Sequence, residues 1–319
     1  MDDLNQTSPD IFILLGLSDV PYLQVICFLM FLLMYICTGV HNNITMLSGN
    51  LLMIIIVRIS PKLHNPMYFF LSNLSTIDVG FSSSTVPIIL KNTISKDRSI
   101  SLLECAIQMY FNLALGVAEC IMLAVMAYDR FAAICKPLYY NIIMTKKLCF
   151  CLAAGSWSVG FINSIIHVAL TFQLPFCRSH HVNHFFCEVP PFLRLSCGDT
   201  LLNEIAVYIS AVIIAVSAFL LTLISYVHII STILKIRYSQ GRYKAFSTCA
   251  SHLIVVTLFY GTSIVLYLQF QSSHSHEIDK IVSIVYTAVT PMLNPFIYSV
   301  RNKDVKETII NSLSRKQNL

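Results

Sequence analysis

The chain of 319 residues is 56% hydrophobic and only 12% charged, and its mean hydropathy is +0.70. Soluble domains carry about twice that charged fraction. The composition therefore excludes an ordinary soluble protein. The formal net charge of +5 calls for no nucleic-acid partner, because the cations follow the loop pattern of a membrane protein described below.

Apolar segments recur along the whole chain, and polar breaks divide them into seven. Each is long enough to cross a bilayer as a helix, which takes about 20 residues. Strands of a transmembrane barrel would be about half as long and would alternate in polarity, and these segments do neither. We therefore predict an all-α membrane protein, a seven-transmembrane helix bundle with helices at about 22–57, 67–90, 104–130, 148–170, 203–234, 245–269 and 280–300.

Lys and Arg are concentrated in the segments that would face the inside if the N-terminus lies outside. This orientation makes residues 1–21 an extracellular tail, 22–300 the membrane domain and 301–319 a cytoplasmic tail that begins with a short amphipathic eighth helix. The first residues are acidic and polar, unlike a cleavable signal peptide. Asn5 begins a glycosylation sequon, which would be usable on an outside tail.

The first apolar segment is too long for a simple membrane crossing. From Tyr22 to Val57 it would measure roughly 54 Å as a straight helix, against a hydrocarbon core of about 30 Å. A polar run from Gly39 to Thr45 interrupts it. We expect a bulge, a kink, a shifted helix start or a loop at this point.

Two acidic residues, Asp78 and Glu119, fall in the middle of the second and third segments. An intramembrane acid is a functional candidate by default. Two carboxylates that face one cavity suggest a bound sodium ion or a shared proton. The alternative is a structural polar cluster, in which Asp78 is hydrogen-bonded to Asn50, Asn294 or Tyr298.

Asp129 and Arg130 stand together where the third segment meets polar sequence. A buried ion pair in hydrocarbon is costly, so we place both at the membrane boundary. There the acid could hold the arginine until a partner from the aqueous side competes for it. The alternative is an interfacial ion pair that only fixes the depth of the helix.

Four cysteines lie in segments predicted to be outside. Cys105 begins the third helix, and Cys177, Cys187 and Cys197 lie in the long loop after the fourth. Extracellular thiols oxidise, and four cysteines allow three pairings. The run from His184 to Glu188 could form a soft-metal site, but a loop packed by a disulfide is the better interpretation.

Enzyme motifs are missing: the chain has no His-Glu-x-x-His, no Gly-x-Ser-x-Gly and no phosphate-binding glycine loop. An ion-conducting protein or transporter would show inverted repeats or several charged residues along a path, and we find no repeat. We therefore predict no catalytic residues.

Several stretches together resemble the odorant receptors, a family of rhodopsin-like G-protein-coupled receptors, and they span most of the chain. Those that carry the resemblance are Leu63 to Ser75 (LHNPMYFFLSNLS), Met126 to Cys135 (MAYDRFAAIC) followed by KPLYY, Lys244 to Leu253 (KAFSTCASHL) and Pro291 to Tyr298 (PMLNPFIY).

The resemblance implies two disulfides, Cys105–Cys187 and Cys177–Cys197. It also exposes a departure in the first helix. There the family places a tyrosine close to a Gly-Asn pair, whereas here Tyr35 and Gly49 lie fourteen positions apart. That difference corresponds to an insertion of roughly eight residues.

The resemblance further implies a ligand pocket in the outer half of the bundle, between helices three, five, six and seven. A dry pocket with a few polar groups suits a small volatile odorant. The residues expected to line it are Met109, Asn112, Leu113, Gly116, Val117, Ile205, Tyr208, Ser263, Tyr267, Ile284 and Thr287.

For signalling, the resemblance implies an outward swing of helix six that activates a heterotrimeric stimulatory G protein and raises cyclic AMP. The expected switch residues are Asp129, Arg130, Tyr128, Lys244 and Tyr298. The protein would reside in the plasma membrane, in contact with membrane lipid. A chemosensory role outside olfaction, or less readily an ion-conducting role, is the alternative.

Overall fold

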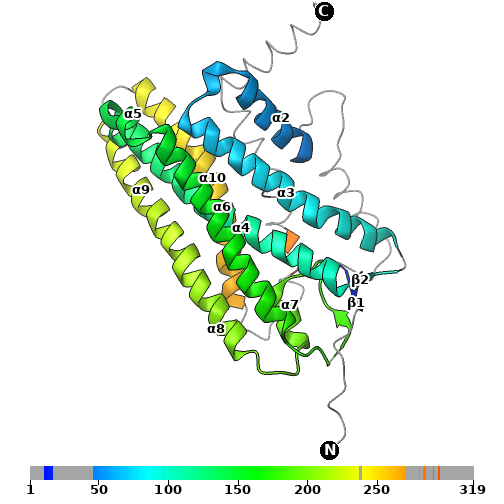
Figure 1. The fold of residues 1–319 in the computed structure, drawn as a ribbon. Coiled ribbons are helices and arrows are strands. Elements are labelled where there is room, and N and C mark those ends of the chain that lie inside the picture. Colours follow the sequence, from blue (N-terminus) through cyan, green and yellow to red (C-terminus); the bar gives the residue numbers. More distant parts are fainter. Residues whose placement is uncertain are drawn as a thin grey trace, which may run out of the picture.

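The computed structural model describes residues 11–16, 46–95, 97–177, 179–236 and 239–269, together with Lys280, Ser283, Ile284, Thr290 and Asn294. Long helices dominate this part of the chain (Figure 1). They are α2 (Met46–Ile59), α3 (Pro66–Ile94), α4 (Leu102–Cys135), α6 (Lys146–Phe172), α8 (Leu201–Ser210), α9 (Ser217–Leu234) and α10 (Ser239–Gln269). A π-helical stretch, Ala211–Val216, joins α8 to α9.

These helices confirm the predicted segments wherever the structure describes them. Among the described residues, three helices are long and apolar enough to cross a membrane, namely Leu102–Cys135, Lys146–Phe172 and Leu201–Leu234. Gly49–Ile59 and Cys249–Ile264 are shorter apolar helices. The polar run from Gly39 to Thr45, most of the seventh segment and the predicted eighth helix lie outside the described residues.

Local sequence explains where the helices begin. Asn65 caps α3 by accepting a hydrogen bond from the Tyr68 amide at 3.2 Å, with Pro66 in the first turn, where its missing N–H costs nothing. Ser101 and Glu104 form a capping box at the start of α4. Thr145 caps α6 as Asn65 caps α3, because its side chain accepts a hydrogen bond from the Leu148 amide at 3.2 Å.

Helix α4 is the centre of the bundle and packs most extensively on α6, α9 and α3 (Figure 1). Gly160 of α6 lies directly against the Ala114 carbonyl of α4, so a larger residue there would collide with the backbone. Ser164 of α6 donates to the Tyr110 carbonyl at 2.6 Å, and Trp157 donates to Asn73 of α3 at 3.2 Å. Large apolar side chains remain exposed on α8 and α9, as expected of a lipid-facing surface.

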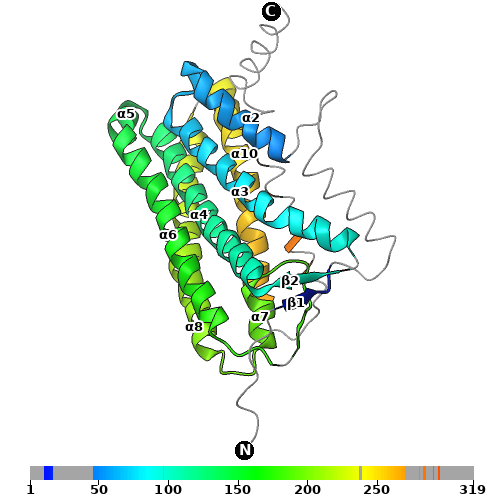
Figure 2. The same cartoon turned by 45° about the vertical axis from the view of Figure 1, so that its right-hand side comes forward.

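The two ends of the bundle differ (Figure 2). We call one the disulfide end, which carries β1 (Ile11–Leu14), β2 (Ser99–Ser101), β3 (His181–Val182) and α7 (Val189–Leu195). We call the opposite one the Arg130 end, where α4 finishes near the short helices η2 (Pro137–Tyr139) and α5 (Tyr140–Ile143).

At the disulfide end, part of the predicted N-terminal tail is a strand. β1 lies between β2 and β3, antiparallel to β2 and parallel to β3. Phe12 and Leu14 on β1 are fully buried, and Phe12 meets Phe176 and Phe192 edge to face. Arg98 donates to the Leu15 carbonyl at 2.7 Å. Residues 11–16 of the tail are therefore part of the packed structure at this end.

Candidate functional site

A cavity of about 350 Å³ lies inside the bundle towards the disulfide end. Helices α4, α6, α8 and α10 form its walls, together with the π-helical stretch that follows α8. The loop from His181 to Glu188 and helix α7 close it. This volume and a largely apolar wall suit a small organic molecule.

Six of the residues predicted to bind ligand line this cavity. Five of them, Met109, Asn112, Leu113, Gly116 and Val117, occupy one face of α4, because their spacing of three and four residues matches the helical repeat. The sixth is Ser263 of α10.

The predicted positions on helix five do not line the cavity. Ile205 is 45% exposed on the outside of α8, and Tyr208 lies off the lining as well. Val207, Ser210, Ala211 and Ile214 take their place. Ile205 and Tyr208 were implied by the resemblance, whereas the packing of α8 turns Val207 and Ser210 toward the cavity. The π-helical stretch then supplies part of the wall, as such segments often do at functional sites.

The remaining predicted positions are on or after α10. Ile284 is half-buried and does not line the described cavity. The side chain of Tyr267, the whole of Thr287 and the glycosylation candidate Asn5 lie outside the described residues.

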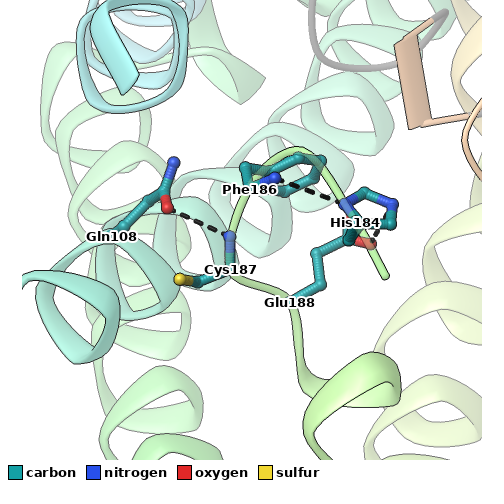
Figure 3. Close-up of polar contacts among 5 residues, drawn as sticks. All are labelled: Gln108, His184, Phe186, Cys187 and Glu188. Atoms are coloured by element: carbon teal, nitrogen blue, oxygen red, sulfur yellow. Dashed lines mark hydrogen bonds and ion pairs between the residues drawn. The ribbon is translucent and has the colours of Figure 1, made fainter. Parts of the chain in front are cut away.

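Both disulfides form in the pairing implied by the resemblance. Cys105 of α4 is bonded to Cys187 of the closing loop, and Cys177, which precedes that loop, is bonded to Cys197, which follows α7. Gln108, one turn along α4 from Cys105, accepts a hydrogen bond from the Cys187 amide at 3.0 Å (Figure 3). The loop is thus tied to α4 by a covalent bond and a buried hydrogen bond.

His184 lies in the closing loop, stacked on Phe185. Its Nδ1 accepts from the Phe186 amide at 3.5 Å, and its Nε2 is 3.7 Å from a Glu188 carboxylate oxygen (Figure 3). Burial is the main cause that lowers the pKa of His184 to about 3, and the Lys280 and Arg194 charges add to it. The imidazole is therefore neutral near pH 7.

The arrangement around His184 agrees with the packed-loop interpretation rather than the soft-metal one. The Cys187 sulfur is part of the disulfide, so it cannot bind a metal as a thiolate. Within the part of the chain that the structure describes, no group of three or more His, Cys, Asp and Glu residues gathers.

Two polar residues of the cavity wall escaped the sequence analysis. His167 of α6 and Ser210 of α8 are hydrogen-bonded, with 2.9 Å between Nε2 and Oγ. They are 43 positions apart and belong to different helices, so no sequence periodicity connects them.

The floor of the cavity reaches the buried acids. Glu119 lines the cavity, and its Oε1 has no hydrogen-bond partner. Deeper, the Asn294 amide donates to both carboxylate oxygens of Asp78, at 3.2 and 3.1 Å. Asn294 also lies next to Glu119, so one amide serves both acids.

At the Arg130 end, the predicted switch residues differ from expectation in one respect. Asp129 accepts a hydrogen bond from the Tyr140 hydroxyl at 2.8 Å, so the acid is held by α5 rather than by Arg130. Arg130 acts on it only as a nearby charge. Burial, together with the Asp129 carboxylate, raises the pKa of Tyr140, which keeps its hydroxyl protonated as a donor. Arg130 was the expected partner of Asp129 because the two residues are adjacent in the sequence. Tyr140 approaches Asp129 only because the chain turns after α4.

Arg130 instead lies close enough to Tyr226 and His252 for its charge to act on both. The Tyr226 hydroxyl of α9 and His252 Nδ1 of α10 are 2.7 Å apart. Tyr128 is 40% exposed, and the side chain of Lys244 and all of Tyr298 lie outside the described residues. Arg130 thus sits where α4, α9 and α10 meet.

Comparison with known proteins agrees with this architecture. The sequence pattern of the family described as "Olfactory receptor" matches residues 36–316. Mouse olfactory receptor 5AP2 is 48% identical over 96% of this chain and 94% of its own length, and human olfactory receptor 5B12 is 47% identical over 98% and 96%. Human olfactory receptor 5G3 is 45% identical over 99% and 98%. The chain therefore belongs to the olfactory receptor family and is a multi-pass G-protein-coupled receptor of the plasma membrane, not an enzyme.

Proposed function

We propose that the cavity between α4, α6, α8 and α10 binds a small, mostly apolar, volatile odorant. The observation that carries this proposal is the cavity itself, lined by six residues that the resemblance had assigned to ligand binding. Its size and apolar wall favour recognition by shape, with a few hydrogen bonds for orientation.

The proposal includes an orientation. The disulfide end would face outside, because disulfides persist in oxidising surroundings, and the Arg130 end would face the cytoplasm, where Lys and Arg cluster. The N-terminus would then be extracellular, and Asn5 could be glycosylated. The tail from 301 to 319 would lie inside.

Signal output would pass through the Arg130 end to a stimulatory, olfactory-type G protein that raises cyclic AMP. Arg130 is buried where α4, α9 and α10 meet, so a movement of α10 would uncover it. A ligand can drive this movement only if it binds the active arrangement more tightly.

The buried acids are candidates for a sodium ion or a shared proton. Sodium is a hard cation, for which oxygen ligands are preferred. Glu119 Oε1 and Asn294 Oδ1 are buried oxygens without hydrogen-bond partners, and both lie near Asp78, so the residues present fit a cation. A rise in melting temperature with sodium chloride but not with choline chloride, lost in Asp78→Asn, would support sodium. If the melting temperature instead depends on pH through the same acids, and choline chloride does not change that dependence, a shared proton is favoured.

The first test of the function is cyclic-AMP output with surface labelling, in cells that co-express the chain and an olfactory-type G protein. An odorant panel is applied to the native chain and to a chain lacking residues 39–46. Odorant-dependent cyclic AMP supports the proposal. Silence of both chains at good surface levels, with no odorant-dependent melting shift, contradicts it.

Arg130→Ala provides the test of the switch. We expect surface delivery to stay normal and odorant-dependent cyclic AMP to be lost, because the variant lacks the guanidinium group that would contact the G protein. The matched control is Arg58→Ala, which removes an exposed cation from the last turn of α2 at the same end. Normal signalling by Arg130→Ala would contradict this mechanism.

A further inference from the structure

His167 and Ser210 form a polar patch in an otherwise apolar wall of the cavity. His167 is only 5% exposed, and the neighbours of Ser210 on that wall are Val207, Ala211 and Ile214. A buried polar pair in such a wall is kept only when its hydrogen bonds are satisfied. The pattern of those bonds therefore indicates what a ligand must bring.

The protons of the pair can be counted. Ser210 has one hydroxyl proton, and its Oγ lies 3.0 Å from the Val207 carbonyl of its own helix and 2.9 Å from His167 Nε2. A carbonyl can only accept, so the serine proton goes to Val207. Both bonds then form together only if His167 carries its proton on Nε2 and donates to Ser210.

In this arrangement both protons of the pair are used internally. What remains is a lone pair on Ser210 Oγ and the lone pair of His167 Nδ1, which makes no hydrogen bond with any described residue. The pair offers acceptors and no donor. A ligand group that donates a proton complements it, whereas a carbonyl or ether oxygen would place lone pair against lone pair.

We propose that the His167–Ser210 pair is the polar anchor of the odorant site and selects ligands that carry a hydroxyl group, namely alcohols and phenols. This inference rests on the proposed function and names its ligand class. Asn163 lies one turn before His167 on the same wall, and its amide can donate to the oxygen of the same hydroxyl.

Three other polar residues of the cavity wall are occupied or of opposite polarity. Tyr260 donates to the Cys120 carbonyl at 3.0 Å and Ser263 to the Phe259 carbonyl at 2.8 Å. Asn112 accepts from Ser84 and Thr85 of α3, at 2.6 and 2.9 Å, which leaves its Nδ2 as a donor without a partner. A ketone or ether could therefore accept a hydrogen bond from Asn112, and this is the rival anchor.

The test measures ligand-dependent melting shifts of the detergent-purified full chain, with cyclic AMP as a second readout. The probes are sets of equal size that differ only at the oxygen: octanol, 2-octanone, methyl heptyl ether and nonane, with matching terpenoid and benzylic sets. The variants are Ser210→Ala and His167→Phe. The control is Ser217→Ala, which changes an exposed serine at the start of α9 whose hydroxyl bonds to the Ile214 carbonyl of the preceding π-helical turn.

We expect the alcohol of a set to bind at least about tenfold more tightly than its ketone or ether, as a site built to hydrogen-bond a group rejects an analogue without it. Ser210→Ala and His167→Phe should reduce this preference to about onefold, and Ser217→Ala should keep it. A loss of affinity for all probes alike would show a structural role and overturn the inference.

Other outcomes separate the two proposals. Ketones or ethers that bind as well as alcohols, and whose binding is lost in Asn112→Leu, would overturn the His167–Ser210 anchor and leave the receptor function standing. If hydrocarbons or amines bind and no alcohol does, the His167–Ser210 anchor is also overturned and the receptor function still stands. No melting shift and no cyclic AMP with any probe in any set would contradict both.

Discussion

The disulfide end and the Arg130 end of the bundle are held together by different kinds of interaction. At the disulfide end, two covalent bonds, a three-stranded sheet and an edge-to-face aromatic cluster join segments far apart in sequence. At the Arg130 end, the described links are noncovalent: an apolar cluster of α4, α9 and α10, and single hydrogen bonds such as Tyr140 to Asp129 and Tyr226 to His252.

This difference matches the work expected of each end. A cavity that selects a ligand by shape needs a rigid, preformed wall. A switch needs two conformations of similar free energy. Breaking contacts at the disulfide end should therefore cost mainly stability. Breaking contacts at the Arg130 end should mainly shift signalling.

The largest effect is expected from Cys105→Ser, which frees the closing loop from α4. Loss of a native disulfide typically costs about 2–5 kcal/mol, so we expect little of this variant at the cell surface. Surface labelling measures the effect. Cys151→Ser, which removes an exposed free cysteine of α6, should be delivered normally. Equal delivery of the two variants would show that the loop holds without its bond.

Phe12→Ala should come next, because it removes a fully buried ring from the aromatic cluster under the closing loop. Truncation of a buried Phe costs about 3–5 kcal/mol, and we expect a value near the lower limit because β1 is only four residues long. The melting temperature of the purified chain should fall clearly. Ile11→Ala, at a neighbouring position that is 56% exposed, should change it little. Similar melting of both would mean that the strand is not part of the packed fold.

The strand of Phe12 also shows where the sequence fails to predict structure. The helices were predictable because a bilayer demands long apolar segments, and α6, for example, was expected at 148–170 and found at Lys146–Phe172. β1 has only four residues, and both its partners are distant in the chain. Nothing local in an apolar run of that length distinguishes a paired strand from a free tail.

The binding site was predictable to a similar extent. The α4 positions that line the cavity were predicted from the resemblance, and they share one helix face. The rotation of α8 was not, because Ile205 and Val207 are equally apolar and only the packing decides which turns inward. His167 and Ser210 were missed because their meaning comes from their contact, which the fold creates.

A smaller effect at the disulfide end should appear on acidification. The pKa of His184 is lowered to about 3, so below about pH 6.5 the unfolded chain binds a proton that the folded chain refuses, and stability falls as the pH falls. By pH 5 the loss is about 1–2 kcal/mol. Glu188, Arg194 and Lys280 are the charged residues that face the imidazole.

Melting curves from pH 7.5 to 5 check this expectation in the native chain and in His184→Gln. The variant should show a shallower decline with falling pH. His64→Gln, an exposed histidine at the Arg130 end, should decline like the native chain. A native decline that His184→Gln leaves unchanged would assign the pH dependence to other groups.

The smallest change in stability is expected from Tyr226→Phe, yet it should alter signalling. The variant loses the 2.7 Å hydrogen bond to His252 that links α9 to α10 beside Arg130. The net contribution of such a bond is about 1 kcal/mol. If it belongs to the resting arrangement, its loss should raise ligand-independent cyclic AMP about fivefold. Tyr243→Phe, on an exposed tyrosine of α10, should leave basal output unchanged. A fall in basal and odorant-driven output at normal surface levels would instead place the bond in the signalling arrangement, and the Arg130 end would then be held at rest by Tyr140 and Asp129.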